Sequence, residues 1–258
     1  MEKYALLGRK LSHSWSQPIH EQYFRLMGME ASYELLEVEP EQLAQLTARL
    51  QEDGYKGVNV TIPYKVDMMS LVDTVSPEAQ AIGALNTVKF DNLSGYNTDY
   101  FGLEQTLQQF GIDLQSQNVV LLGTGGASRA VAALCRDKGC RSLTYVSREK
   151  KDNTITYAEY AQTAHDGILI NATPVGMYPA VDNSPVADVS GFCAVVDLIY
   201  NPVQTRLLQM AAATGCVAVN GLYMLVAQAV CAQTIWNHTA VEREIIEQIY
   251  QTMAEVAG

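Results

Sequence analysis

The stretch NVVLLGTGGASRA, residues 118–130, decides the fold of this chain. Its apolar run predicts a buried strand, Gly123-Thr124-Gly125-Gly126 predicts a tight turn, and Ala127 begins a helical pattern that ends at Lys138 before Gly139. Glycines in such a turn let backbone amides approach a pyrophosphate at the partly positive end of a helix. The stretch therefore predicts a dinucleotide-binding loop. A glycine turn without a ligand is the alternative, and the flanking strand and helix disfavour it.

The third position of this loop pattern is Ser128, where glycine or alanine is usual, so the loop is a variant. The next predicted strand ends in Ser147-Arg148-Glu149-Lys150-Lys151, where such folds place the residue that contacts the adenosine ribose. An arginine at this place suits a 2′-phosphate and favours NADP. A solvated charge run remains the alternative for the two lysines, and Glu149 leaves NAD open.

Short apolar runs continue on both sides of the glycine loop and predict an α/β fold. After residue 100 they have the short, buried character of a parallel sheet covered on both faces. Before residue 100 they alternate with helical patterns at residues 18–29 and 40–53. The expected strands are residues 4–8, 33–38, 57–62 and 84–90, followed by 118–123, 143–147, 167–171, 194–197 and 217–220.

The change in character near residue 100 predicts two domains. Two helical patterns close the sequence, at residues 223–236 and 241–256, and they are long enough for the tail to pack back on the first domain. We therefore expect an N-terminal α/β domain of residues 1–100 and 235–258, and a Rossmann-like parallel-sheet domain of residues 101–234.

The composition excludes several classes of protein. With 28 acidic and 17 basic residues among 258, the formal net charge is -11, which disfavours nucleic-acid and anionic-membrane surfaces. An anionic ligand must therefore be held by a local cluster. Five cysteines show neither metal-ligand spacing nor a disulfide framework, and no apolar run has the length of a membrane span. We expect a cytoplasmic protein without a metal site.

Lys65 and Asp99 are the candidate proton-transfer residues. Lys65 follows Asn59-Val60-Thr61-Ile62-Pro63-Tyr64, in which polar side chains alternate along a strand and Pro63 suits the first turn of a helix. A cation at a helix N-terminus is unfavourable by about 0.3–1 kcal/mol, which invites a functional explanation. An ordinary exposed lysine and a helix-capping aspartate are the alternatives. Paired, the two side chains could perform general acid–base catalysis.

Ser14 and Ser16 precede a helix that Pro18 helps to start, so helix capping is the default interpretation. Hydroxyls and free amides at a helix N-terminus also bind a carboxylate, and the two roles are compatible. His13 and His20 have no convincing metal spacing, and we expect them to have structural or supporting roles.

At this point the sequence resembles the shikimate dehydrogenase family, from Tyr4 to about Trp236. Eight motifs in order carry the resemblance: residues 13–16 (HSWS), 59–65 (NVTIPYK), 83–87 (GALNT), 97–99 (NTD), 123–127 (GTGGA), 171–177 (NATPVGM), 197–202 (DLIYNP) and 221–228 (GLYMLVAQ). The resemblance implies a reversible reduction of 3-dehydroshikimate to shikimate by NADPH, a step in aromatic amino acid biosynthesis. It implies a small-molecule substrate and no metal, with a monomer or homodimer as the expected assembly.

The resemblance also implies roles for residues at the matching positions. Lys65 and Asp99 would form the catalytic pair. The substrate carboxylate would be bound by Ser14 and Ser16, and its ring hydroxyls by Thr61, Asn86, Asp99, Tyr200 and Gln228. The cofactor pyrophosphate would be bound by Gly123, Thr124, Gly125, Gly126 and Ala127, the adenosine phosphate by Arg148, and the nicotinamide side by Thr173, Leu198 and Gly221.

The sequence departs from the family pattern in three places. Ser147-Arg148-Glu149 replaces the usual Asn-Arg-Thr, which bears on the preference for NADP over NAD. Trp15 and Gln17 flank the two serines in place of commoner residues. The segment between Ser147 and Gly167 is shorter than the usual crossover, which predicts a reduced helix and a trimmed adenosine side.

Two other functions stay open at this point. A quinate/shikimate dehydrogenase that uses NAD is favoured by Glu149 and disfavoured by the two serines. A dehydrogenase-like sensor that binds its ligand without turnover could lose the proton-transfer pair, whereas this sequence keeps Lys65 and Asp99.

Overall fold

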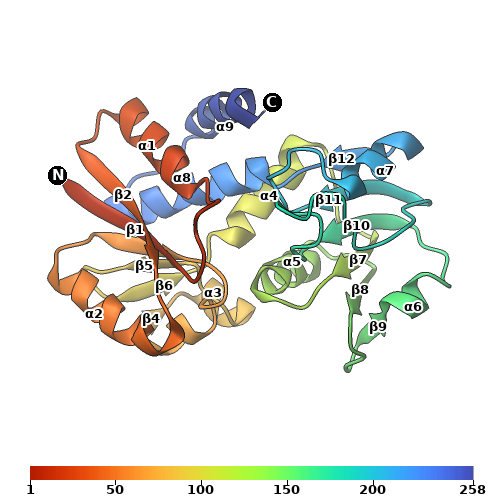
Figure 1. Cartoon of the computed structure of the whole chain (residues 1–258), viewed down its shortest axis with the longest axis horizontal. Helices are drawn as coiled ribbons and strands as arrows, with labels where there is room; N and C mark the ends of the chain where they lie inside the picture. The colour runs from red at the N-terminus through yellow and green to blue at the C-terminus, as the bar shows by residue number, and fades with distance from the viewer. Residues whose placement is uncertain (258) are drawn as a thin grey trace. The chain divides into compact units, whose positions relative to one another are not determined.

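The computed structural model describes residues 1–257 and divides the chain into two compact units (Figure 1). The first unit comprises Met1–Gly102 and Val226–Thr252, and the second comprises Leu103–Leu225 and the end of the chain from Met253. Within the described residues, no helix is both long enough and apolar enough to cross a membrane.

The first unit is built on a six-stranded mixed sheet with the strand order β2-β1-β3-β5-β6-β4. The strands are β1 (Glu2–Gly8), β2 (Ala31–Glu37), β3 (Gly57–Val60), β4 (Thr74–Val75), β5 (Thr87–Lys89) and β6 (Ser94–Tyr96). Strand β1 is parallel to β2 and β3, whereas β5 is antiparallel to both of its neighbours. Asn59, Thr87 and Tyr96 are paired across β3, β5 and β6, which brings polar side chains of three strands into one row.

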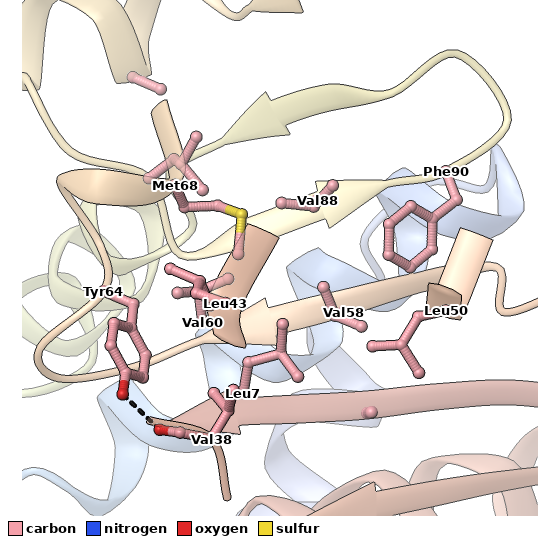
Figure 2. Packing of buried hydrophobic residues seen from close by; sticks show 13 residues of the cluster. Leu7, Val38, Leu43, Leu50, Val58, Val60, Tyr64, Met68, Val88 and Phe90 are labelled. Atoms are coloured by element: carbon pink, nitrogen blue, oxygen red, sulfur yellow. Dashed lines mark hydrogen bonds between the residues drawn. The ribbon is translucent and has the colours of Figure 1, made fainter. Parts of the chain in front are cut away.

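The helical segments of the first unit pack around an apolar core. They are α1 (Ser16–Met27), η1 (Pro40–Gln42), α2 (Leu43–Glu52), η2 (Asp67–Ser70), α3 (Pro77–Ile82), and parts of α4 (Asp99–Gln109), α8 (Leu222–Asn237) and α9 (Arg243–Ala257). Figure 2 shows Leu43 and Leu50 of α2 facing Val58 and Val60 of β3, all with less than 5% of their surface exposed. Burial of each such side chain contributes roughly 1.5–3 kcal/mol.

The second unit is a six-stranded, wholly parallel sheet. Its strands are β7 (Asn118–Leu122), β8 (Ser142–Ser147), β9 (Thr154–Thr156), β10 (Gly167–Asn171), β11 (Phe192–Asp197) and β12 (Val217–Val219). Their order is β12-β11-β10-β7-β8-β9. Counted from β7 as the first strand, this is the 3-2-1-4-5-6 order of a Rossmann fold, in which ligands bind at the carboxyl ends of the strands where the order reverses.

Helices α5 (Gly126–Asp137), α6 (Tyr157–Tyr160) and α7 (Arg206–Thr214) pack on this parallel sheet. Strand register places Leu122, Val146, Asn171 and Asp197 in one row at the carboxyl edge of the four central strands. Every loop that follows these residues therefore starts at the same edge.

The predicted α/β fold with a Rossmann-like second part is confirmed. All nine strands expected from apolar runs are present, whereas the short strands β4, β6 and β9 were not predicted. The segment between β8 and β10 holds the short strand β9 and the four-residue helix α6, so the reduced helix expected from its short length is also confirmed.

Candidate active site

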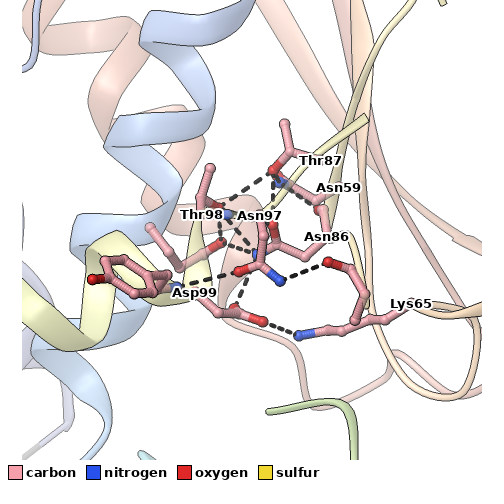
Figure 3. Close-up of polar contacts among 10 residues, drawn as sticks. Asn59, Lys65, Asn86, Thr87, Asn97, Thr98 and Asp99 are labelled. Carbon is pink, nitrogen blue, oxygen red and sulfur yellow. Dashed lines mark hydrogen bonds and ion pairs between the residues drawn. The ribbon is translucent and has the colours of Figure 1, made fainter. Parts of the chain in front are cut away.

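Lys65 and Asp99 form a buried ion pair in the first unit (Figure 3). Lys65 Nζ donates to Asp99 Oδ2 at 2.6 Å, and only 13% and 9% of the two side chains are exposed. The backbone of Lys65 is also held, because its carbonyl accepts a hydrogen bond from the amide of Leu85 at 2.8 Å. A short charge-assisted bond shielded from water fixes both the position and the partner of the amine.

The helix expected after Pro63 is not present. The Ile62-Pro63 peptide bond is cis, residues 62–66 form turns, and the helical segment η2 begins only at Asp67 and is four residues long. Lys65 therefore does not lie at the N-terminus of an α-helix, and the argument from an unfavourable helix end is wrong. The case for Lys65 rests instead on its contact with Asp99.

The carboxylate of Asp99 contacts two side chains and does not serve as a simple helix cap. Asp99 is the first residue of α4, and the amide of Tyr100 donates to Asn97 Oδ1 at 3.2 Å, which caps the helix start. Asn86 Nδ2 donates to Asp99 Oδ1 at 2.9 Å. Lys65 and Asn86 thus bind different oxygens of the same carboxylate, which restricts rotation of the group.

Asn86 lies at the centre of a buried polar cluster (Figure 3). Its Oδ1 accepts from the amide of Thr98 at 2.7 Å and from the hydroxyl of Thr87 at 3.2 Å. Its Nδ2 lies 3.4 Å from Oε1 of Gln228 on α8, which is only 8% exposed and also accepts from the Thr98 hydroxyl. Lys65, Asn86, Asp99 and Gln228 are therefore brought together in the first unit, as four of the predicted site residues.

The two serines form a second polar group at the start of α1. The amide of Ser16 donates to Ser14 Oγ at 3.2 Å, and the hydroxyl of Ser14 lies 3.2 Å from that of Ser16. The N-cap residue is Trp15, and its side chain makes no capping hydrogen bond. The start of α1 therefore presents two adjacent hydroxyls rather than a conventional side-chain cap.

The remaining substrate-side predictions fall at strand ends. Thr61 directly follows β3, and its amide donates to the carbonyl of Leu7 at 2.9 Å. Tyr200 is half-buried, follows β11, and belongs to the second unit.

The glycine loop has the local geometry that a phosphate group requires. Gly123 has φ of +100°, a conformation that side chains disfavour, and α5 begins at Gly126 with no side-chain cap at Gly125. A Cβ added to Gly125 would meet nothing within 4 Å, so the space before the helix N-terminus is open. Uncapped amides beside open space at the positive end of a helix fit a pyrophosphate.

The three predicted nicotinamide-side residues adjoin this loop at the carboxyl edge of the parallel sheet. A Cβ at Gly123 would lie 2.9 Å from Cγ2 of Thr173, and one at Gly221 would lie 2.1 Å from the carbonyl oxygen of Leu198. The amide of Leu198 donates to the carbonyl of Asn171 at 3.0 Å. The loops after β7, β10, β11 and β12 are thus in direct contact within the second unit.

Asp197 holds two of these loops together. Its Oδ1 accepts from Asn171 Nδ2 at 2.9 Å and from the amide of Ile199 at 3.2 Å, and its Oδ2 accepts from the hydroxyl of Thr205 at 2.7 Å. The side chain is fully buried, and burial raises its pKa to about 6 although the three donors oppose the shift. Asn171 Oδ1 in turn accepts from the amide and hydroxyl of Thr173.

Arg148 is exposed directly after β8, on the strand next to β7. Lys150 is already engaged, because its ammonium pairs with Glu159 and lowers the pKa of that carboxyl to about 2. The alternative of a solvated charge run therefore fits Lys150, which has an acidic partner in its own loop. Arg148 is the cation better placed to meet a phosphate beside the glycine loop.

Several residues of these two clusters had no predicted role. Asn59, Thr87 and Thr98 extend the network of the first unit, and Asn171 and Asp197 organise the loops of the second. The signal for Asn59 was available, since it is a polar residue inside an otherwise apolar strand. Among the described residues, no group of three or more His, Cys, Asp or Glu side chains could hold a metal ion.

Comparison with known proteins agrees with the two-part structure. Residues 6–88 match the model of the shikimate dehydrogenase substrate binding domain. A shikimate dehydrogenase (NADP(+)) of Clostridium beijerinckii is 40% identical over 263 residues, covering 97% of each chain. Shikimate dehydrogenase 1 of Peptoclostridium difficile has a solved structure with 41% identity and a TM-score of 0.93, with 98% of each chain covered.

A third relative was solved with both ligands. It is the shikimate 5-dehydrogenase of Thermus thermophilus in complex with NADP(H) and shikimate, with 31% identity, a TM-score of 0.86, and coverage of 98% of this chain and 99% of that one. Sequence similarity and structural similarity thus extend over nearly the full length of both units. The chain belongs to the shikimate dehydrogenase family.

Proposed function

We propose that this protein catalyses the reversible, NADPH-dependent reduction of 3-dehydroshikimate to shikimate, the reaction of its family. The observation that carries the proposal is the buried contact of Lys65 Nζ with Asp99 Oδ2 at 2.6 Å. An amine held this way can give a proton to a carbonyl oxygen and take it back from a hydroxyl, which is general acid–base catalysis. The choice of substrate and cofactor follows the names of the relatives, a shikimate dehydrogenase (NADP(+)) and a shikimate 5-dehydrogenase in complex with NADP(H) and shikimate.

In the proposed mechanism Lys65 and Asp99 take part only in proton transfer. NADPH, when bound, supplies the hydride to the carbonyl carbon. Lys65 gives a proton from its ammonium to the carbonyl oxygen, which becomes the hydroxyl of shikimate, and in the reverse direction Lys65 takes this proton back. Asp99 holds the amine and offsets its charge, while Asn86 holds the opposite oxygen of Asp99.

The proposal assigns the other residues by their positions. Ser14 and Ser16 would bind the substrate carboxylate, and the ring hydroxyls would be bound by Thr61, Asn86, Asp99, Tyr200 and Gln228. The second unit would bind the pyrophosphate through residues 123–127, the 2′-phosphate through Arg148, and the nicotinamide through Thr173, Leu198 and Gly221. Residues 1–100 with 235–258 would thus form the substrate domain, and residues 101–234 the NADP domain.

We also propose a cytoplasmic location. All five cysteines of the chain are free thiols, and reducing compartments maintain cysteines in that form. Cell fractionation followed by detection of the protein would test the location, and recovery in a membrane or secreted fraction would contradict it.

The deciding experiment is to follow oxidation of NADPH by the purified protein with 3-dehydroshikimate. The reverse reaction should then be compared for shikimate and quinate, each with NADP+ and NAD+. The proposal expects the highest kcat/KM with shikimate and NADP+. Equal or higher values with quinate and NAD+ would favour a quinate/shikimate dehydrogenase, and binding of shikimate without turnover would favour a sensor.

A further inference from the structure

His20 is a fully buried histidine at the end of a hydrogen-bonded line that leads to Asp99. It lies on α1 with none of its surface exposed, and its ring stacks on that of Tyr33 with centroids 4.0 Å apart. One ring nitrogen contacts Asn59 Oδ1 at 3.1 Å and the other contacts Gln233 Nε2 at 2.8 Å. All of these residues belong to the first unit.

The neighbours of His20 determine which ring nitrogen carries the proton. Gln233 Oε1 accepts from Asn237 Nδ2 at 3.0 Å, so the amide group of Gln233 is the one directed at the ring. His20 Nδ1 must therefore accept, and Nε2 must carry the proton that is donated to Asn59. Burial lowers the pKa of His20 to about 3, so the ring is neutral at neutral pH and keeps this arrangement.

The orientation of Asn59 follows from that of His20. Asn59 Oδ1 accepts from His20 Nε2 and from the Tyr33 hydroxyl, the latter at 2.8 Å. With its carbonyl oxygen occupied by two donors, Asn59 directs Nδ2 the other way, to Thr87 Oγ1 at 3.0 Å and to the carbonyl of Asn86 at 3.2 Å. A rotated amide would set its NH2 group against the protonated Nε2 of His20 inside the core, which is strongly unfavourable.

Hydrogen bonds of Thr87 and Asn86 connect Asn59 to Asp99. Thr87 Oγ1 accepts from Asn59 and has one proton to donate, to Asn86 Oδ1 at 3.2 Å or to Thr98 Oγ1 at 3.3 Å, while Asn86 Oδ1 also accepts from the amide of Thr98. These donors leave Asn86 Nδ2 to bind Asp99 Oδ1. Asn86 consequently holds Asp99 twice, once at its carboxylate and once through the backbone of the preceding residue (Figure 3).

We propose that His20 is a positioning residue for the Lys65–Asp99 pair, acting through Asn59 and Asn86, with Gln233 selecting the tautomer that does so. This inference rests on the proposed function, since it concerns the efficiency of that reaction. His20 does not contact the pair directly. Its effect is to give the buried amides one consistent orientation, so that Asp99 is held in place before the substrate binds.

The test compares four proteins in oxidation of shikimate by NADP+: wild type, His20→Phe, His20→Gln and Ile19→Ala. Phenylalanine keeps a ring to stack on Tyr33 but removes the donor and the acceptor. Glutamine restores a donor and an acceptor on one side chain. Ile19 is a fully buried apolar neighbour on the same helix, so Ile19→Ala is the matched control for lost packing.

We expect His20→Phe to lower kcat by about ten- to hundredfold while KM for shikimate changes by less than about threefold, as for a misplaced catalytic group. His20→Gln should recover a substantial part of kcat. Ile19→Ala should lose thermal stability yet keep kcat within about threefold of wild type. If His20 had a purely structural role, His20→Phe and Ile19→Ala would both lose stability and would have similar kcat values.

A second variant keeps the test decisive if His20→Phe does not fold. Gln233→Met leaves the ring in place but removes the donor that selects its tautomer, and it should lower kcat in the same direction by a smaller factor. An inactive wild-type protein would overturn the proposed function. An active wild type whose His20 or Gln233 variants match Ile19→Ala in kcat would overturn the inference alone.

Discussion

At the scale of single residues, the surroundings of a buried lysine–carboxylate pair distinguish a functional amine from a structural one. Lys65 is mostly buried, and an unpaired charge there would be unfavourable by several kcal/mol. Lys89 offers a comparison within the same unit, since it is also buried and pairs with Asp91 at 3.1 Å. Burial and pairing alone therefore do not define a catalytic lysine, and the surrounding cluster of Asn86 and Gln228 must be included.

Lys65 and Lys89 should therefore differ in their response to mutation. Lys65→Ala should lower kcat by about a hundredfold or more with a modest change in KM, because the lost group acts mainly in the transition state. Steady-state kinetics with shikimate and NADP+ would measure both values. Lys89→Met, which removes an equally buried amine outside the proposed site, should keep kcat near that of wild type. A Lys65→Ala protein with unchanged kcat would contradict the mechanism.

The two cations after β8 should also differ in effect. Arg148→Ala should raise KM for NADP+ more than KM for NAD+, because only the former carries a 2′-phosphate for the guanidinium to bind. Lys150→Ala should change both values little, since that amine already pairs with Glu159. Equal increases for the two cofactors in Arg148→Ala would argue against a phosphate contact.

At the scale of secondary structure elements, the carboxyl edge of the parallel sheet organises the second unit. The strands bring Asn171 and Asp197 into register, and Asp197 also binds the hydroxyl of Thr205, which caps α7. A single carboxylate thereby joins β10, β11 and α7. The loops that carry Thr173 and Leu198 depend on this connection for their positions.

The raised pKa of Asp197 predicts a pH dependence of stability. Its folded-state pKa of about 6 exceeds the ordinary value of 3.8, so the folded protein binds the extra proton between these values. The contribution of this proton to the unfolding free energy is therefore present at low pH and is lost as pH rises through about 6. Between pH 5 and pH 8 we expect a loss of about 1–2 kcal/mol of unfolding free energy from this group.

Chemical denaturation of wild type and Asp197→Asn across that pH range would measure the effect. Asparagine can still accept at Oδ1 and can donate to the Thr205 hydroxyl, so the variant should fold. Its unfolding free energy should lack the part of the pH dependence that comes from Asp197. Asp188→Asn is the control, because Asp188 is exposed and its pKa is lowered by the hydrogen bonds from Ser190. If the unfolding free energies of wild type and Asp197→Asn changed with pH in parallel, Asp197 would not be the source of the pH dependence.

At the scale of the whole molecule, the chain separates its chemistry between two compact units. The proton-transfer pair lies in the first unit and the glycine loop in the second, while helices α4, α8 and α9 have residues in both. With a net charge of -11 the protein as a whole repels anions, so an anionic cofactor depends on local groups such as the N-terminus of α5.

Cofactor binding should therefore be measurable as stabilisation of the whole protein. At about one hundred times its Kd, NADP+ should add about 2.7 kcal/mol to the unfolding free energy and raise Tm. Gly125→Val should abolish this increase by filling the open space before α5. Its own Tm without cofactor should stay near wild type, since Gly125 has an ordinary φ of -81° and its Cβ would meet no neighbour. A preserved NADP+ effect in Gly125→Val would place the pyrophosphate elsewhere.

The sequence by itself determined the α/β class, nearly all of the longer elements, the glycine loop and the candidacy of Lys65 and Asp99. These depend on local patterns: apolar runs, glycine turns and motif order are readable along the chain. The helix after Pro63 was predicted wrongly for the same reason, because a proline that suits a helix start also suits a cis turn.

Only the tertiary structure decided which polar groups meet. Lys65 and Asp99 are 34 residues apart, and His20 and Gln233 are 213 apart, so no local pattern reports their contacts. Burial then converts these contacts into constraints, because an amide or imidazole removed from water must satisfy every donor and acceptor among fixed neighbours. The direction of each hydrogen bond between His20 and Asp99 is therefore a property of the folded core.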